Sequence, residues 1–146
     1  MMGYQSFALG MLACLGYCLL CHIPKKSIPV AAIIGGFSWL IYVTMVDEGS
    51  GKVMASFVAA AFVAIISDIS SRVLKEAATI FIIPGIIPLV PGAGMYYTMI
   101  EIVNGQYSKA AVIGGETFFI AGAIALSLLL IGSVTRILHA IKRKIV

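Results

Sequence analysis

Five long apolar runs, separated by short polar connectors, make up most of this chain. They cover residues 3–21, 28–46, 53–69, 77–99 and 110–135. Because an α-helix rises 1.5 Å per residue and the hydrocarbon core of a bilayer is about 30 Å thick, one crossing needs about 20 residues. The pattern predicts an all-α integral membrane protein with about five transmembrane helices, of which the third is the shortest. The connectors are too short to hold a folded domain, so we expect residues 1–146 to form a single transmembrane domain.

Composition supports the same interpretation. Hydrophobic residues make up 61% of the 146 residues and charged residues 11%, and the mean hydropathy is +1.08. Soluble domains carry roughly a quarter charged residues, so lipid must be the main solvent of this chain. The net charge of +4 does not indicate nucleic-acid binding, because the basic residues lie between apolar runs and not on one polar face with aromatic residues among them.

Basic residues fall on alternate connectors. Eight of the ten lie in the first and third connectors and in segment 136–146, and the other two are Lys52 and Lys109. Positively charged connectors are retained on the cytoplasmic side of a membrane. The charge pattern therefore predicts that the N-terminus lies outside and the C-terminus inside, with residues 136–146 as a basic cytoplasmic tail.

The fourth run contains three prolines within eight residues, Pro84, Pro88 and Pro91. A proline has no N–H, clashes with the carbonyl four residues earlier, and favours extended geometry in the residue before it. We therefore expect the fourth helix to break at membrane depth. A second half-helix is expected to begin at Gly92 and to run to about Val103.

A helix break inside a bilayer is tolerated only where it is buried in protein or lines a water-filled cavity. In transporters, the freed carbonyls hold cations, and the N-terminus of the next half-helix binds anionic groups. We therefore predict substrate-binding residues in and after the break, namely Pro84, Gly85, Pro88, Pro91, Gly92, Gly94, Tyr96, Tyr97 and Thr98. The alternative is a structural kink that binds no ligand.

Two carboxylates are candidates for coupling transport to protons. Glu116 lies seven residues into the fifth run, about 10 Å below the boundary if that run is helical. An ionised carboxylate inside hydrocarbon costs at least ~2.5 kcal/mol, so an unpaired one tends to take up a proton. The fifth helix could pack on the fourth and bring Glu116 near the hydroxyls that follow the break. The alternative is that Glu116 forms a salt bridge or lies at the membrane interface. Glu101 is the second candidate for proton coupling. A third carboxylate, Asp68, is expected to pair with Arg72.

Three cysteines, Cys14, Cys18 and Cys21, share one face of the first predicted helix. Their spacing is not that of a zinc module, and small cysteines are ordinary packing residues between membrane helices. We expect packing, with a metal site as the alternative, and we expect no cofactor. No span combines acids and histidines, so an enzyme is not expected.

The segment Pro-Gly-Ile-Ile-Pro-Leu-Val-Pro-Gly at residues 84–92, with tyrosines soon after, resembles the signature of the threonine/serine exporter family. The resemblance is strongest over residues 53–132 and is to the shorter C-terminal-type half, which in split two-component members works with a larger membrane subunit. It implies a bacterial plasma membrane protein and proton-driven export of threonine and serine, or of small dicarboxylates such as succinate in split members.

Physical reasoning also favours a partner. A unit with five spans has its ends on opposite sides, so two such units joined in sequence give the inverted repeats on which many transporters are built. The alternatives are a homo-oligomer or a non-transporting membrane scaffold or assembly protein.

Overall fold

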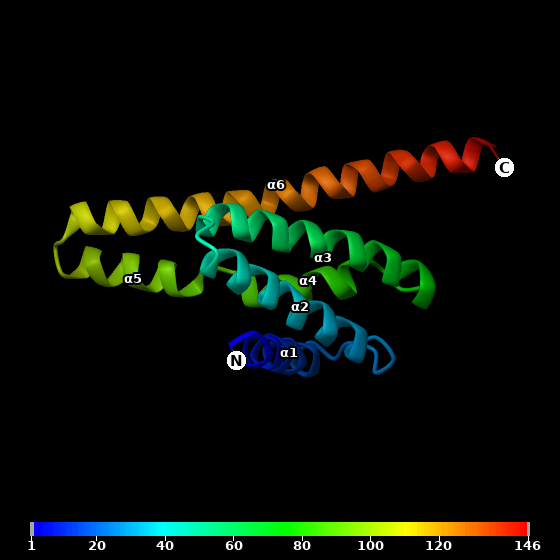
Figure 1. Ribbon diagram of the computed structural model, residues 1–146, viewed down its shortest axis with the longest axis horizontal. Helices are drawn as coiled ribbons and strands as arrows, with labels where there is room; N and C mark the ends of the chain where they lie inside the picture. Colours follow the sequence, from blue (N-terminus) through cyan, green and yellow to red (C-terminus); the bar gives the residue numbers. More distant parts are fainter. Residues whose placement is uncertain (1, 146) are drawn as a thin grey trace.

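The computed structural model describes the backbone of residues 2–145 and the side chains of residues 4–135. Its elements are α1 (Met2–Leu20), α2 (Ile28–Asp47), α3 (Lys52–Leu74), α4 (Thr79–Ile86), the short 3₁₀ helix η1 (Ile87–Leu89), α5 (Gly92–Val103) and α6 (Tyr107–Ile145). Every regular element in the described residues is helical, which confirms the predicted all-α class (Figure 1).

Three helices are long and apolar enough to cross a membrane: α2, α3, and α6 over Tyr107–Thr135. A fourth crossing is available if Thr79–Leu89 and Gly92–Val103, which are bent by 49°, count as one broken span. The apolar part of α1, Tyr4–Leu20, is shorter. The structure therefore supports three to four spans by length and composition, and a crossing by α1 stays a prediction.

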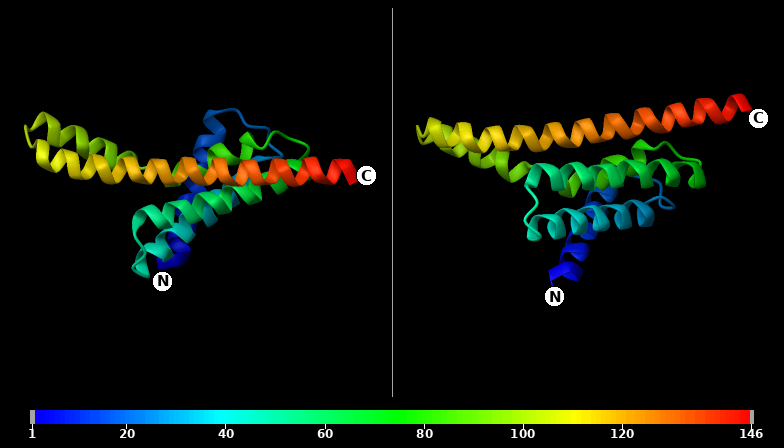
Figure 2. Two further views of the ribbon diagram at one scale, coloured as in Figure 1. Left: turned by 90° about the horizontal axis from the view of Figure 1, so that it is seen from above. Right: turned by 45° about the horizontal axis from the view of Figure 1, so that its top comes forward.

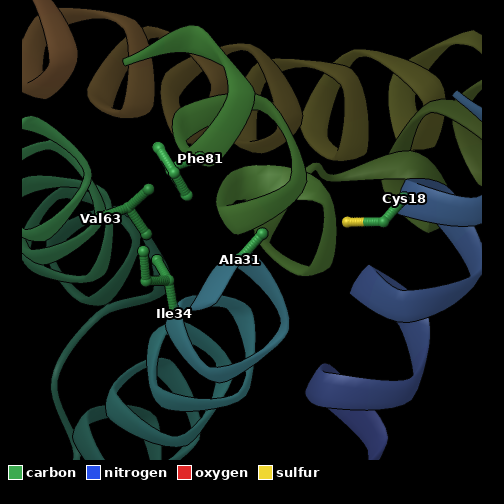
Figure 3. Close-up of a cluster of buried hydrophobic side chains, with 5 residues drawn as sticks. All are labelled: Cys18, Ala31, Ile34, Val63 and Phe81. Atoms are coloured by element: carbon green, nitrogen blue, oxygen red, sulfur yellow. The ribbon is translucent and has the colours of Figure 1, made fainter. Parts of the chain in front are cut away.

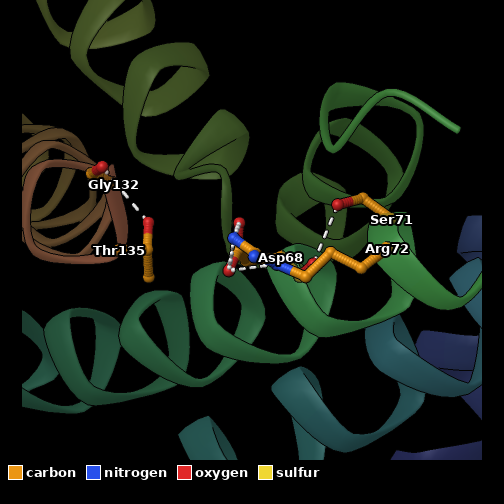
Figure 4. Close-up of polar contacts among 5 residues, drawn as sticks. All are labelled: Asp68, Ser71, Arg72, Gly132 and Thr135. Carbon is orange, nitrogen blue, oxygen red and sulfur yellow. Dashed lines mark hydrogen bonds and ion pairs between the residues drawn. The ribbon is translucent and has the colours of Figure 1, made fainter. Parts of the chain in front are cut away.

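The third helix is longer than its apolar run of residues 53–69 suggests. It spans 23 residues because the polar residues in its last turns are satisfied within the helix. Arg72 donates to both carboxylate oxygens of Asp68 at 2.9–3.2 Å, which confirms the predicted pair, and the Ser71 hydroxyl donates to the carbonyl of Asp68 (Figure 4). The predicted third span is thus a full-length helix.

Helices α1 and α2 are packed through glycines. A Cβ added at Gly10 would lie 2.7 Å from the Cβ of Trp39, and one added at Gly36 would lie 2.7 Å from the ring of Phe7. Small residues let membrane helices approach to backbone contact. The α1–α2 pair is therefore held at a separation that larger side chains would prevent.

Two buried clusters connect the elements. The first joins α1 to α4 through Cys18, Ala31, Ile34, Val63 and Phe81 (Figure 3). The second joins α3, η1 and α6 through Ala59, Ala60, Leu89, Ile120 and Ile124. Because Leu89 belongs to η1, the helix break is anchored to the second cluster.

The first and third connectors, which carry four of the ten basic residues, lie at the same end of the molecule. The ammonium of Lys26, between α1 and α2, is 2.8 Å from the carboxylate of Glu76, between α3 and α4. The last turns of α6 lie toward this end as well (Figure 1). The arrangement agrees with the predicted charge sorting, whereas the orientation in a membrane stays a prediction, and the side chains of the basic tail 136–146 lie outside the described residues.

Helices α3 and α6 run in the same direction but begin at different levels (Figures 1 and 2). The Ser127 hydroxyl donates to the carbonyl of Phe57 at 2.9 Å. From this contact, α6 extends back about 30 Å to Tyr107 and α3 only about 8 Å to Lys52. The first part of α6, residues 107–120, therefore projects about 20 Å beyond the start of α3. We call α5 together with residues 107–120 the projecting hairpin; α5 packs against α6 and no other helix of the described chain.

Candidate substrate site at the helix break

The break between α4 and α5 is made in two steps. Helix α4 continues past Pro84 to Ile86, and the chain then tightens into η1. Val90 takes an extended conformation with φ −61° and ψ 125°, as expected for the residue before Pro91. The expectation of extended geometry also before Pro84 and Pro88 was wrong, because Ile83 and Ile87 keep helical geometry.

Two backbone carbonyls at the end of α4 accept hydrogen bonds from side chains of other helices. The Cys14 thiol donates to the carbonyl of Pro84 at 2.8 Å. The Ser38 hydroxyl shares its proton between the carbonyl of Gly85 at 2.8 Å and that of Gly35, in its own helix, at 2.9 Å. Both donors are buried. The α4 side of the break is thus buried in protein, so these two carbonyls are occupied and do not form the cation site expected by analogy with transporters.

Pro84 and Gly85 are therefore supporting residues in this structure. Both are buried, and a Cβ added at Gly85 would lie 2.8 Å from Val63 and 3.0 Å from Ile34. The glycine allows α4 to approach α2 and α3 at backbone distance. These two predicted residues hold the break in place and do not line the cavity next to it.

A cavity of about 440 Å³ lies on the α5 side of the break. Its walls come from the end of η1 and the first turn of α5, from α2, from the first residue of α3 and from α6. The lining residues are Trp39, Tyr42, Lys52, Pro88, Leu89, Val90, Pro91, Gly92, Ala93, Gly94, Tyr97, Ile113, Glu116, Thr117 and Ile120.

Six predicted site residues meet in this cavity, and five do not. The cavity contains Pro88, Pro91, Gly92, Gly94, Tyr97 and Glu116. The residues away from it are Pro84, Gly85, Tyr96, Thr98 and Glu101. Sequence reasoning missed Trp39, Tyr42 and Lys52, which reach the site from helices distant in the chain. Neighbouring Trp39 and Tyr42 rings stack with centroids 5.2 Å apart, and their i, i+3 spacing on an apolar helix was the available signal.

The N-terminus of α5 opens into the cavity. Pro91 is the N-cap residue and no side chain caps this helix. The Gly92 N–H bonds to the carbonyl of Val90, whereas the N–H groups of Ala93 and Gly94 have no acceptor among the described residues. Free N–H groups and the positive end of the helix dipole favour a negatively charged ligand group at this position.

One ion pair lies in the cavity wall. Lys52 Nζ is 3.0 Å from Glu116 Oε1, and the two side chains are 53% and 47% exposed. They are the only charged side chains among the described residues that line the cavity. In the structure Glu116 is therefore salt-bridged, which was the alternative given in the sequence analysis. A role of Glu116 in proton coupling stays a prediction.

Helices α5 and α6 pack closely beside the cavity, which confirms the expected contact between the broken helix and the last one. A Cβ added at Gly114 would lie 3.1 Å from the Thr98 methyl group, and one added at Gly94 would collide with the Thr117 hydroxyl oxygen. The Thr98 and Thr117 hydroxyls each donate within their own helix at 2.7 Å. The hydroxyls expected near Glu116 were those of Tyr96, Tyr97 and Thr98, and of these residues only Tyr97 lines the same cavity.

Glu101 lies elsewhere on α5. One of its carboxylate oxygens, Oε2, is buried and has no hydrogen-bond partner among the described residues. An unsatisfied buried carboxylate oxygen is unusual in a folded protein. Its role in coupling also stays a prediction.

A multi-pass membrane protein with a discontinuous helix beside a cavity that contains an ion pair has the architecture that secondary transporters use for substrate binding. Comparison with known families gives the specific assignment. Residues 6–134 match the family described as Threonine/Serine exporter, ThrE. The chain therefore belongs to the threonine/serine exporter family, a family of transporters and not of enzymes. No solved structure matches the chain.

Proposed function

We propose that this chain is a subunit of a secondary transporter that exports threonine, serine or a chemically similar small molecule, and that the cavity at the helix break is its substrate site. The observation that carries the proposal is the meeting of an uncapped helix N-terminus and an ion pair in one cavity of about 440 Å³. This volume is within the range of small-molecule sites.

Substrate binding follows from the groups in the cavity. The carboxylate of the substrate accepts hydrogen bonds from the free N–H groups of Ala93 and Gly94, and the positive end of the α5 dipole stabilises it. The aromatic side chains of Trp39, Tyr42 and Tyr97 form the walls. Export of a small dicarboxylate such as succinate is the other substrate class that the family resemblance implies.

A larger membrane subunit completes the pathway in this proposal, in a bacterial plasma membrane. The projecting hairpin supports it, because Met95, Tyr96, Met99 and Val103 of α5 are 59–84% exposed. An apolar surface of this kind requires lipid or protein around it. The inverted-repeat architecture of transporters would place a second unit beside it; a homo-oligomer is the other arrangement.

Proton coupling is the remaining part of the proposal. Protonation of Glu116 would remove its charge and release Lys52 from the ion pair. Glu101 offers a second carboxylate, with a buried oxygen that has no partner among the described residues. Either residue could link substrate movement to proton movement.

A scaffold or assembly function is the second candidate, and one observation favours it. The Cys14 and Ser38 caps satisfy the carbonyls of the break without any ligand. A protein whose break only shapes helix packing would need just such caps.

Export from cells tests the choice between the two. Cells that lack their own threonine exporters are loaded with a threonine-containing dipeptide, and threonine release is measured with the chain, its membrane partner, or both. The proposal predicts release only when the transporter is complete, and loss of release when Pro88 and Pro91 are both replaced by Ala, with membrane insertion intact. Equal release with and without the chain would favour the scaffold, as would undiminished release by the double variant.

A further inference from the structure

We propose that the Lys52–Glu116 ion pair is the specificity-determining element of the cavity and selects zwitterionic α-amino acids over dicarboxylates. This inference rests on the proposed function, because it concerns the same site. It decides between the two substrate classes that the family resemblance leaves open.

The charges in the cavity are balanced. Lys52 and Glu116 supply one positive and one negative group, with Nζ and Oε1 3.0 Å apart, and the other side chains of the wall are uncharged. The N-terminus of α5 adds a partial positive charge and two free N–H groups on one side. The cavity therefore has a cationic region and a single anionic point next to each other.

An α-amino acid carries the complementary pair of charges on one carbon atom. Its carboxylate can replace Glu116 as the partner of Lys52 while it accepts hydrogen bonds from Ala93 and Gly94. Its ammonium can replace Lys52 as the partner of Glu116. Every charge that loses a partner when the ion pair opens gains another from the substrate. The pair is about half exposed, and exposed ion pairs are weak, so it can open at little cost.

A dicarboxylate lacks this match. Its first carboxylate can bind Lys52 and the start of α5, but the second meets the carboxylate of Glu116 and finds no second cationic side chain in the described wall. Like charges at such separations repel, unless one of them takes up a proton. Glu116 therefore acts against dicarboxylates and in favour of ammonium groups, which is specificity by both attraction and repulsion.

Binding to analogues with one charge removed tests the proposal. The full chain, in lipid nanodiscs with the membrane partner with which it co-purifies, is titrated with L-threonine, N-acetylthreonine, threonine methyl ester and succinate. The first compound has both charges, the second only the carboxylate, and the third only the ammonium. We expect threonine to bind at least tenfold more tightly than each of the other three.

Substitutions assign the two charges to the two residues. Glu116→Gln should weaken threonine binding at least tenfold while N-acetylthreonine and succinate bind as well as before or better. Lys52→Gln should weaken threonine and N-acetylthreonine but not the methyl ester. Glu76→Gln is the matched control, because it removes an ion pair of similar length, with Lys26, outside the cavity; all four affinities should be unchanged.

The outcomes separate this inference from the proposed function. Succinate binding as tightly as threonine, or a Glu116→Gln variant that still discriminates between threonine and N-acetylthreonine, would overturn the selection by the ion pair even if threonine is exported. The expected binding pattern without any threonine flux in vesicles would support the selection and overturn the export function. Binding of none of the four compounds would contradict both.

Discussion

Replacement of Gly94 by Ala should reduce threonine export, because the added methyl group distorts the cavity. The new Cβ would collide with the Thr117 hydroxyl oxygen and would lie 3.3 Å from the Thr117 Cβ. Thr117 cannot turn away freely, because its hydroxyl donates to the carbonyl of Ile113 at 2.7 Å. Overpacking of this kind costs about 1–3 kcal/mol, and the better helix propensity of Ala returns at most about 1 kcal/mol.

The strain can be relieved by moving α5 away from α6. Because α5 packs on no other helix of the described chain, such a shift would carry the start of α5 away from Glu116. A misplacement of about 1 Å can cost 10²-fold in a positioned site, so we expect threonine export by Gly94→Ala to fall at least tenfold at equal membrane abundance. The assay is threonine efflux from loaded cells, with thermal unfolding in detergent as the measure of stability.

Two further variants serve as controls for Gly94→Ala. Gly115→Ala adds the same methyl group on α6, two residues before Thr117. Nothing lies within 4 Å of the added Cβ there, so efflux should be unchanged. Thr117→Ala in the Gly94→Ala background removes the colliding oxygen and should restore part of the efflux. Wild-type efflux by Gly94→Ala would refute the packing argument, as would equal losses in the Gly94 and Gly115 variants.

Three other predictions concern stability, topology and coupling. Ser38→Ala leaves the buried carbonyl of Gly85 without its donor, so unfolding in detergent should be easier by about 1–3 kcal/mol; an unchanged unfolding temperature would contradict the capping role. A cysteine at Gly49 should react with an impermeant thiol reagent in intact cells and one at Lys75 should not, since the basic connectors are predicted to face the cytoplasm; the opposite labelling would reverse the orientation. Threonine flux in vesicles that contain a pH-sensitive dye should move protons, and the protons moved per threonine should be lost in Glu116→Gln but retained in Glu116→Asp; an unchanged ratio in the Gln variant would exclude Glu116 as the coupling residue.

Features set by local sequence could be predicted. The break depends on proline geometry, so the prolines placed the start of α5 at Gly92. The pair Asn104-Gly105 placed its end near Val103, and the structure has both ends there. The pairing of Asp68 with Arg72 depends only on their i, i+4 spacing on one helix. The length of α3 was underestimated, because hydropathy does not show that polar side chains are satisfied within the helix.

Features set by tertiary packing could not be predicted. Lys52 was assigned to a connector, but the offset between α3 and α6 allows its long side chain to reach Glu116. Cys14 and Ser38 were ordinary residues of apolar helices, and their role as donors depends on which carbonyls the break exposes. Tyr96 and its neighbour Tyr97 were equivalent in the sequence, and only the rotation of α5 decides that Tyr97 lines the cavity.

The central claim is that the cavity at the start of α5 is the substrate site, and substrate protection of a cysteine at position 93 tests it most directly. Ala93 lines the cavity and is exposed. Cys14 and Cys18 are buried, so replacement of the exposed Cys21 by Ser gives a suitable background. In that background we expect Ala93→Cys to be labelled by a small thiol reagent and to be protected by threonine in a concentration-dependent way, whereas a cysteine at the hairpin residue Val103, which is 84% exposed, should be labelled equally with and without threonine. Labelling at position 93 that threonine does not reduce, in a protein that still exports threonine, would contradict the account.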